Sequence, residues 1–339
     1  MMSNISYKEK NVLVTGADGF IGSHLSEELV RKGANVTALA QYNSFGSNGW
    51  LDKVDQSIRG DLTIKRGDIR DAGCVNAIVE KQEIVFHLAA LIAIPFSYEA
   101  PQSYIDVNVS GTLNVLEAAR RFGVERVVQT STSEVYGSAE FTPITEDHPL
   151  HGQSPYSASK IAADMMCEAY VRSFELPLVI IRPFNTYGPR QSERAVIPTV
   201  IRQALDPDCD IIKLGDLTPK RDFNYVGDTV DGFLRAGCAN NLDFGVPYNV
   251  GSGVAVTIGE MVECVNSICG ANKPVHQDDA RARPAKSEVS ELLACPKQFI
   301  DKTGWESKVD LELGLSHTIE WWRSIIQAGE TRYDSDYLI

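Results

Sequence analysis

The stretch NVLVTGADGFIGSHLSEELVRKG, residues 11–33, decides the fold. It opens with an apolar run, continues through Gly16, Gly19 and Gly22, and ends in an amphipathic segment. Uninterrupted apolar runs are typical of parallel strands that helices cover on both faces. The GxxGxxG spacing permits a tight turn, close approach of the backbone to a pyrophosphate and close packing of the following helix. The stretch therefore predicts a strand, a turn and a helix that together bind a dinucleotide.

The helix after this turn should begin near Phe20 and Ile21. Because the first N–H groups of a helix have no partner within it, they can donate to a phosphate. We therefore expect the phosphates of the cofactor to contact Gly16, Gly19, Phe20, Ile21 and Gly22. A purely structural turn is the alternative for the glycines alone, and the flanking strand and helix disfavour it.

The second strand, residues 35–40, predicts which dinucleotide binds. A carboxylate that binds the adenosine ribose is expected about twenty residues after the glycines. This chain instead has Ala40 followed by Gln41. Gln41 can still hydrogen-bond a ribose hydroxyl, and no arginine stands beside it to bind a 2′-phosphate. The sequence therefore favours NAD over NADP.

Two further strand ends should complete the cofactor site. In IKRGDIRD, residues 64–71, Asp68 and Ile69 follow a short strand, and Asp68 can accept a hydrogen bond from the adenine amino group. The buried run EIVFHLAA, residues 83–90, ends in Leu88, Ala89 and Ala90. A bulkier side chain at those small residues would block the dinucleotide.

Strands and helices continue to alternate along the first half of the chain. A long amphipathic segment over residues 103–122 ends at Gly123, and strands at 126–132 and 178–185 flank a helix from 156 to 174. This alternation predicts an α/β fold with a doubly wound parallel (Rossmann) sheet. We expect a first domain from residues 1–184 plus about 221–250. Residues of about 185–220 plus 251–339 should form a smaller, discontinuous α/β domain over the carboxyl ends of the strands, where ligands bind.

The reactive residue types concentrate between Thr130 and Lys160. Tyr156 and Lys160 are four residues apart, so they share one helix face, and an ammonium near a phenol favours the phenolate. Thr132 and Glu134 lie at the end of the preceding strand. A hydroxyl, a carboxylate, a phenol and an amine can therefore converge where the strand meets the helix. Each residue alone fits a solvated surface, and their shared context favours an active site.

Composition excludes several classes of protein. A net charge of −13 argues against binding to nucleic acid or to an anionic membrane. The seven cysteines form no CxxC pair, which fits reduced thiols in a cytoplasm. The polar N-terminus predicts no signal peptide, and the longest apolar run is too short to span a bilayer. The six histidines lack the spacing of metal ligands, so we expect no metal site.

The motifs TGADGFIG, GDIRD, HLAA, TSTSEVYG, YSASK, RPFNTYGPR and RDFNYV occur in this order along the chain. With them the chain resembles, over nearly its whole length, the extended short-chain dehydrogenase/reductases that act on nucleotide sugars. The resemblance implies that Thr132, Tyr156 and Lys160 form the triad for hydride transfer. It also implies a homodimer in which the helices around 104–122 and 156–174 form a four-helix bundle; packing within one subunit is the alternative.

The segment TSTSEVYG resembles the sugar 4,6-dehydratases of this family. They carry a carboxylate at the position of Glu134, whereas 4-epimerases generally do not. Ser133 stands where many dehydratases have an aspartate that protonates the departing hydroxyl, and uronate decarboxylases share the Ser-Glu pair. The stretches LAQYNSFGSNGWL, LIAIPFSYEAPQSY and SPYSASKIAADMM resemble the dehydratases that begin legionaminic-acid synthesis. This resemblance implies a UDP- or GDP-linked N-acetylglucosamine as substrate.

In a net acidic protein, a substrate diphosphate requires individually placed cations. The candidates are Arg190, Arg221 and Arg283, because guanidinium groups match phosphate oxygens. A surface ion pair is the alternative for each of them. Asn185, in RPFN, should donate to a phosphate or orient the sugar. Ile94, in the loop 93–98, should border the sugar ring.

The resulting hypothesis is a cytoplasmic, NAD-dependent nucleotide-sugar 4,6-dehydratase. In it Tyr156 takes the proton of the C4 hydroxyl, Thr132 hydrogen-bonds that hydroxyl, and Glu134 removes the C5 hydrogen. Either Glu134 delivers a proton to the departing C6 hydroxyl, or Ser133 positions a water that does so. A uronate decarboxylase, a 4-epimerase and a non-catalytic dinucleotide sensor remain as alternatives.

Overall fold

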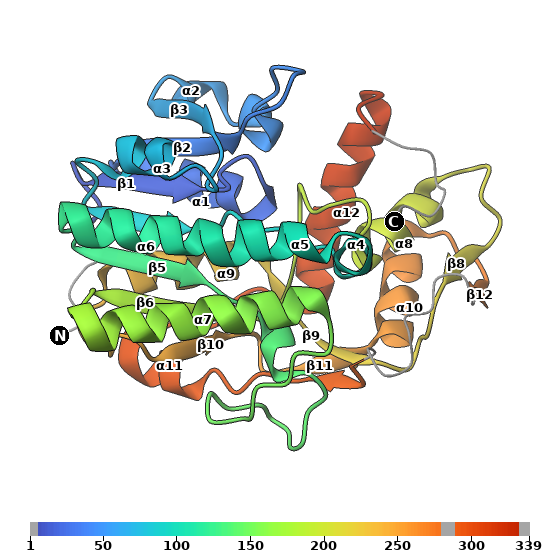
Figure 1. Ribbon diagram of the computed structural model, residues 1–339. Helices are drawn as coiled ribbons and strands as arrows, with labels where there is room; N and C mark the ends of the chain where they lie inside the picture. The colour runs from blue at the N-terminus through green and yellow to red at the C-terminus, as the bar shows by residue number, and fades with distance from the viewer. Residues whose placement is uncertain (1–5, 279–288, 332–339) are drawn as a thin grey trace.

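The computed structural model describes residues 6–278 and 289–331, and Figure 1 shows its arrangement of helices and strands. Its main sheet has seven strands in the order β10-β6-β5-β4-β1-β2-β3, and every neighbouring pair is parallel. These strands are β1 (Asn11–Thr15), β2 (Asn35–Gln41), β3 (Leu62–Gly67), β4 (Ile84–His87), β5 (Arg126–Thr130), β6 (Leu178–Pro183) and β10 (Pro247–Val250). The predicted doubly wound parallel sheet is confirmed. Its strand order reverses between β1 and β4, and ligands of such sheets bind outside the carboxyl ends there.

Helices cover both faces of this sheet, as its apolar strands require. Side chains of β1 point alternately to the two faces of the sheet. Val12 and Val14 belong to the apolar core on one face, and Leu13 belongs to the core on the other. The first face carries α1 (Phe20–Arg31), α9 (Val226–Cys238) and α11 (Lys297–Thr303), and the short η1 (Gly49–Lys53) and α2 (Gln56–Arg59) lie beside α1. The second face carries α3 (Ala72–Val79), α6 (Gly111–Phe122) and α7 (Pro155–Phe174).

The long helix expected over residues 103–122 is present in pieces. It comprises α5 (Pro101–Tyr104), the π-helical η2 (Ile105–Ser110) and α6, and the short α4 (Ile94–Glu99) precedes it. Gly123 ends it in the left-handed conformation, with φ 65°, as a glycine readily does. Pattern reading did not predict the π-helical turn, a feature that is frequent at functional sites. There Asn108 donates to Ser159 of α7 at 2.9 Å and so ties the two helices together.

A second part of the molecule has its own sheets and core. Strands β7 (Asn185–Tyr187), β9 (Lys220–Tyr225), β11 (Ala255–Thr257) and β13 (Glu291–Leu292) form one sheet, and β8 (Ile212–Leu214) pairs with β12 (Val275–Gln277). Helices α8 (Val196–Leu205), α10 (Ile258–Cys269) and α12 (Leu311–Gln327) enclose an apolar core and lie together in Figure 1. We expected the chain to return to the first domain at about residue 221. Because β9 pairs within the second sheet, the return begins with α9.

Candidate active site

The end of β5 places the first reactive group. After Thr130 the chain leaves the strand, and Thr132 caps the short η3 (Ser133–Tyr136) by accepting a hydrogen bond from the Glu134 N–H at 3.2 Å. This cap fixes Thr132 and Glu134 next to each other at the carboxyl edge of the sheet. Ser133 lies between them and is buried, whereas Glu134 is partly exposed.

The start of α7 places the phenol and the amine. Ser154 and Ser157 form a reciprocal capping box around Pro155, so the helix begins just before Tyr156. Tyr156 and Lys160 are both buried, with 7% and 4% of their surface exposed. The Lys160 ammonium donates to the carbonyl oxygen of Thr130 at 2.5 Å. That bond holds the first turns of α7 against the end of β5, so the structure brings the four predicted groups to one place.

The environment of Tyr156 corrects one expectation. Burial raises the pKa of Tyr156, a hydrogen bond with the Thr132 side chain opposes this rise, and the negative charge of Glu134 adds to it. We expected Lys160 to lower the Tyr156 pKa towards neutrality. In the structure the cost of burying a phenolate outweighs every favourable contact, because Ile94 and Tyr104 pack against the ring. Glu134 is thus one of the charged groups near this phenol.

A buried ion pair that pattern reading missed lies behind Lys160. Asp164, one turn further along α7, accepts hydrogen bonds from Arg182 of β6 at 3.0 and 3.2 Å and from Ser131 at 2.7 Å. Asp164 and Arg182 are almost completely buried. Burial lowers the pKa of Lys160, and the Asp164 charge opposes that effect. The signal in the sequence was a carboxylate four residues after Lys160 and an arginine inside the apolar run LVIIRPFN.

The glycine turn after β1 fits a dinucleotide. Gly16 has φ +66°, and a Cβ there would lie 2.8 Å from the Ala89 backbone. A Cβ on Gly22 would lie 2.2 Å from the Gly16 carbonyl oxygen. Gly19 precedes the first residue of α1, and no side chain caps that helix end, so the N–H groups of Phe20 and Ile21 begin the helix there. This narrow turn offers a helix N-terminus to a pyrophosphate.

The remaining cofactor candidates line the same edge of the sheet. Leu88 and Ala89 donate their N–H groups to the Thr15 hydroxyl at 3.1 and 3.2 Å, and Ala90 follows them. The Thr130 hydroxyl is buried and has no hydrogen-bond partner in the structure. An unpaired buried hydroxyl at a strand end that lines this edge fits the presence of a polar ligand.

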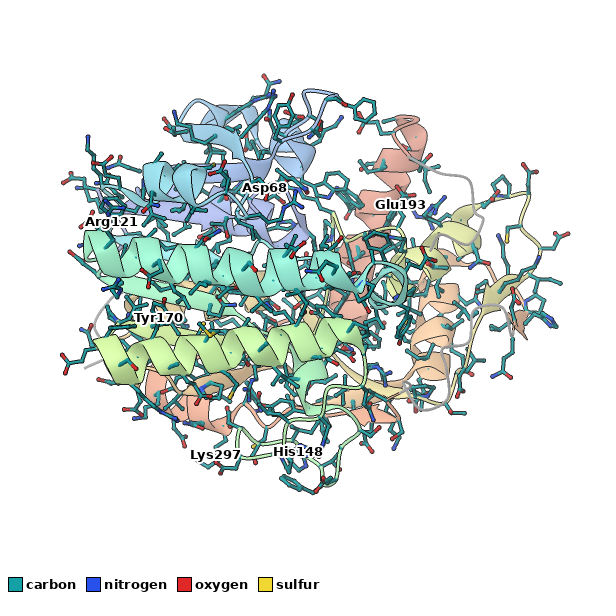
Figure 2. All side chains as sticks on the ribbon, in the orientation of Figure 1. Asp68, Arg121, His148, Tyr170, Glu193 and Lys297 are labelled. Atoms are coloured by element: carbon teal, nitrogen blue, oxygen red, sulfur yellow. The ribbon has the colours of Figure 1, made fainter. Side chains whose placement is uncertain are left out.

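The candidates for the adenosine end lie further along the sheet. Gln41 is the last residue of β2 and is exposed, and its N–H donates to an oxygen of Asp18 at 3.1 Å. The Asp68 carboxylate accepts hydrogen bonds from Arg70, and this contact holds the Asp68 pKa below its usual value. Figure 2 labels Asp68 above α6 in that view. Ile69 is buried.

The residues predicted to bind substrate differ in their surroundings. Ile94 begins α4 and packs with Tyr104 and Tyr156, whose rings meet edge to face at 6.2 Å, and Asn185 begins β7. Arg190 pairs with Glu27 of α1 at 2.8 Å, so its guanidinium is directed towards that helix. Arg221 is buried in β9 and donates to a backbone carbonyl. Arg283 lies outside the described residues.

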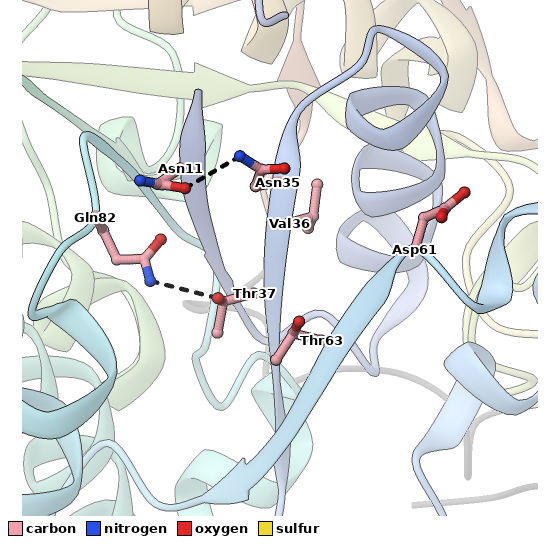
Figure 3. A pocket seen from close by; sticks show the side chains of 7 residues that line it. All are labelled: Asn11, Asn35, Val36, Thr37, Asp61, Thr63 and Gln82. Atoms are coloured by element: carbon pink, nitrogen blue, oxygen red, sulfur yellow. Dashed lines mark hydrogen bonds between the residues drawn. The ribbon is translucent and has the colours of Figure 1, made fainter. Parts of the chain in front are cut away.

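A polar hollow lies at the opposite edge of the sheet, among the amino ends of the first strands (Figure 3). Within it Asn35 donates to Asn11, and Gln82 donates to Thr37. The residues that line it are Asn11, Asn35, Val36, Thr37, Asp61, Thr63 and Gln82. Ligands of doubly wound sheets bind at the carboxyl ends, so this hollow is separate from the site described above. In the described ranges no group of histidine, cysteine and carboxylate side chains is arranged to hold a metal ion, and no helix is long and apolar enough to cross a bilayer.

The fold and this site define a dinucleotide-binding α/β protein with a phenol and an amine at the end of β5. Residues 13–318 match the family described as GDP-mannose 4,6 dehydratase, so the chain belongs to that family. The resemblance to enzymes that act on nucleotide sugars is confirmed at the level of this family.

Curated relatives carry three different activities. A UDP-glucose 4-epimerase from Mycolicibacterium smegmatis is 34% identical, over 92% of this chain and 98% of the relative. A UDP-N-acetyl-alpha-D-glucosaminuronate decarboxylase from Bacillus cytotoxicus is 32% identical, over 94% and 99%. A dTDP-glucose 4,6-dehydratase from an Actinoplanes species is 30% identical, over 92% and 98%. The chain thus falls in a class of nucleotide-sugar dehydratases, epimerases and decarboxylases.

Solved structures of similar proteins agree with this class. DesIV, a dTDP-glucose 4,6-dehydratase from Streptomyces venezuelae solved with NAD and TYD bound, has a TM-score of 0.82 and 30% identity, over 92% of this chain and 97% of that one. TunA, a NAD-dependent NDP-hexosamine 5,6-dehydratase, has a TM-score of 0.79 and 30% identity, over 93% and 98%. NAD, the dinucleotide that the sequence predicts, is the one named in both.

Proposed function

We propose that this protein is an NAD-dependent 4,6-dehydratase that converts a UDP- or GDP-linked N-acetylglucosamine to its 4-keto-6-deoxy form. One observation carries the proposal. Glu134 lies at the start of η3 with its N–H bonded to the Thr132 hydroxyl, and its negative charge acts on the Tyr156 phenol. An epimerase needs one proton-transfer group at C4, whereas a dehydratase needs a second base for C5, and Glu134 supplies it.

The residues that fit NAD are the glycine turn, the N-terminus of α1, the strand ends at Gln41, Asp68 and Leu88, and the unpaired Thr130 hydroxyl. When bound, NAD supplies a hydride acceptor for C4 and then a hydride donor for C6, so the reaction has no net redox change. A positive charge beside the ring would favour the phenolate and oppose the rise that burial causes in the Tyr156 pKa.

The protein's own groups carry the proton transfers. Tyr156 accepts the proton of the C4 hydroxyl while Thr132 hydrogen-bonds the same oxygen. The ketone at C4 makes the C5 hydrogen acidic, and Glu134 removes it. Because Ser133 is buried and Glu134 is partly exposed, Glu134 is also the better placed of the two to deliver a proton to the departing C6 hydroxyl. One carboxylate can serve both steps since they occur on neighbouring carbons.

The choice of sugar rests on the resemblance to dehydratases that begin legionaminic-acid synthesis. Two of the three stretches that carry it, residues 91–104 and 154–166, meet at Tyr156, where Tyr104 and Ile94 pack. Residues from two of the stretches on which that resemblance depends therefore pack around the phenol. This supports an N-acetylglucosamine substrate in the biosynthesis of a cell-surface glycan.

We also propose a homodimer in the cytoplasm. Helices α6 and α7 lie side by side (Figure 1). Exposed apolar side chains along them and on η2, which leads into α6, are Ile105 of η2, Phe122 of α6, and Met165 and Phe174 of α7. A four-helix bundle with a second copy would cover these side chains. All seven cysteines lie in the described part of the chain and are free thiols, which fits a reducing compartment.

The experiment that tests the function is incubation with UDP- and GDP-linked N-acetylglucosamine, glucose and glucuronate, followed by product mass. The proposal requires loss of one water from an N-acetylglucosamine substrate. A specific observation favours decarboxylation as the second candidate, because the Bacillus cytotoxicus relative acts on an N-acetylated uronate and the chain has the Ser-Glu pair. Loss of carbon dioxide from glucuronate would favour that candidate. An unchanged mass with inverted C4 would favour an epimerase, and no reaction would favour a sensor.

Replacing Glu134 by glutamine tests its role directly. The variant should still oxidise C4, because Thr132, Tyr156 and Lys160 remain, but exchange of the C5 hydrogen with deuterated water should stop. A matched control is Glu140→Gln, an exposed carboxylate further along the same loop that pairs with His151. Dehydration retained in Glu134→Gln, or lost equally in both variants, would remove Glu134 from the mechanism.

A further inference from the structure

Asp18 occupies an unusual place in the glycine turn, between Gly16 and Gly19. Its carboxylate accepts the N–H of Gln41, the last residue of β2, at 3.1 Å. Its carbonyl oxygen accepts the N–H of Trp50 at 3.0 Å. The segment after β2 packs so closely here that a Cβ on Gly49 would lie 2.4 Å from that oxygen. Asp18 is therefore held from two sides at the carboxyl end of β2.

The end of β2 is where a dinucleotide-binding sheet needs a carboxylate. An acidic residue there accepts hydrogen bonds from the ribose hydroxyls of the adenosine. This chain has Gln41 in that position, and the amide carries no charge. Asp18 brings a carboxylate within hydrogen-bond distance of the Gln41 backbone, so the missing charge is supplied from the glycine turn.

The electrostatic setting of Asp18 fits a carboxylate that receives hydroxyl donors. The ion pairs of the described residues do not include Asp18, so no lysine or arginine among them balances its charge. Burial raises its pKa, and the Gln41 N–H opposes that rise. A carboxylate that is partly shielded from water and has no cation is stabilised by further hydrogen-bond donors. An additional phosphate on that ribose, at the end of β2, would bring further negative charge next to this carboxylate.

We propose that Asp18 accepts the adenosine ribose hydroxyls of NAD in place of the acidic residue that β2 lacks, and that its charge excludes the 2′-phosphate of NADP. This role of Asp18 deepens the proposed function and rests on it only in taking NAD as the bound dinucleotide. It concerns cofactor choice and does not depend on which sugar reacts.

The test is the ratio of NAD to NADP affinity in the variant Asp18→Asn. Asparagine keeps an oxygen for the Gln41 N–H and nearly the same volume, so the turn should be retained, while the charge is lost. We expect the preference for NAD over NADP to fall by about ten- to hundredfold, the size of effect that one nearby negative charge has on a phosphate. Dissociation constants are measured by titration calorimetry on protein stripped of dinucleotide, without any sugar present. An unchanged ratio would overturn the proposal.

Two further variants separate charge from structure. Gln41→Asp in the Asp18→Asn background places a carboxylate at the end of β2 and should restore the preference for NAD. Asp52→Asn is the control, because Asp52 braces the same segment through Asn48 and should leave the ratio unchanged. A lowered ratio in Asp52→Asn, or no restoration by Gln41→Asp, would overturn the proposal. A protein that shows these ratios but dehydrates no sugar would support Asp18 and refute the proposed function.

Discussion

Replacing Asp164 by asparagine should destabilise the fold more than most single substitutions. The change removes one charge from a pair in which Arg182 donates at 3.0 and 3.2 Å and both side chains are at most 2% exposed. The Arg182 guanidinium would keep its hydrogen bond to the Tyr136 hydroxyl at 3.1 Å, but its charge would be uncompensated away from water. Breaking a buried pair from one side costs about 3–5 kcal/mol, a large part of a typical free energy of unfolding.

The assay is urea denaturation at neutral pH, compared among three variants. Asp164→Asn alone should lower the free energy of unfolding by that amount. The double variant Asp164→Asn, Arg182→Met should recover most of the loss, because it leaves no unpaired charge. Asp301→Asn is the control, since its partner Lys297 is exposed on α11 (Figure 2) and such surface pairs contribute little. A cost below about 1 kcal/mol for Asp164→Asn, or a double variant less stable than the single one, would refute this reasoning.

The same substitution should shift the pH dependence of activity. Burial lowers the pKa of Lys160, and the Asp164 charge opposes this, so removing the charge lowers that pKa further. An activity that requires the Lys160 ammonium is lost as pH rises through its pKa. The alkaline decline of the pH–rate profile should therefore move to lower pH in Asp164→Asn. A decline that stays in place would show that Asp164 has only a structural role.

Two further predictions concern a buried histidine and the glycine turn. Burial lowers the pKa of His87 in the folded protein to about 3. In the unfolded chain the same imidazole is protonated as the pH falls through about 6.5. The free energy of unfolding should thus fall by about 2 kcal/mol as pH decreases from about 6.5 to 5. His87→Gln should flatten this part of the curve in urea denaturation, and an unchanged slope would contradict the assignment. Gly22→Ala places a methyl group 2.2 Å from the Gly16 carbonyl oxygen and should weaken NAD binding by about tenfold or more in titration calorimetry. Gly60→Ala meets nothing within 4 Å and is its control; equal affinities in the two variants would contradict the argument.

Local spacing was enough to predict the parts of the site that lie within one strand, turn or helix. The glycine turn before α1 and the pair Tyr156 and Lys160 at the start of α7 are set by neighbours a few residues away. Apolar runs predicted the parallel sheet for the same reason, because burial on both faces leaves a continuous pattern in the sequence. Gly123 ended its helix where the pattern placed the end.

Contacts between distant segments could not be predicted in this way. Asp18 and Gln41 meet because two strand ends lie side by side, and Asp164 meets Arg182 because α7 packs on β6. The direction of the Tyr156 pKa shift depends on how Ile94 and Tyr104 cover the ring. Each of these properties comes from tertiary packing. Residue spacing within one element can mark a candidate such as Asp164, but it does not identify the partner on another element.

The path of the chain between its two parts restricts how such a protein can change during evolution. The chain leaves the main sheet after Pro183, returns at Val226, and leaves again after Val250. It comes back with α11 against β10, and α12 then packs in the core of the second part. A region interleaved in this way cannot be exchanged between relatives by recombining one contiguous gene segment. Transfer of the whole second part by recombination would therefore require at least two separate gene segments.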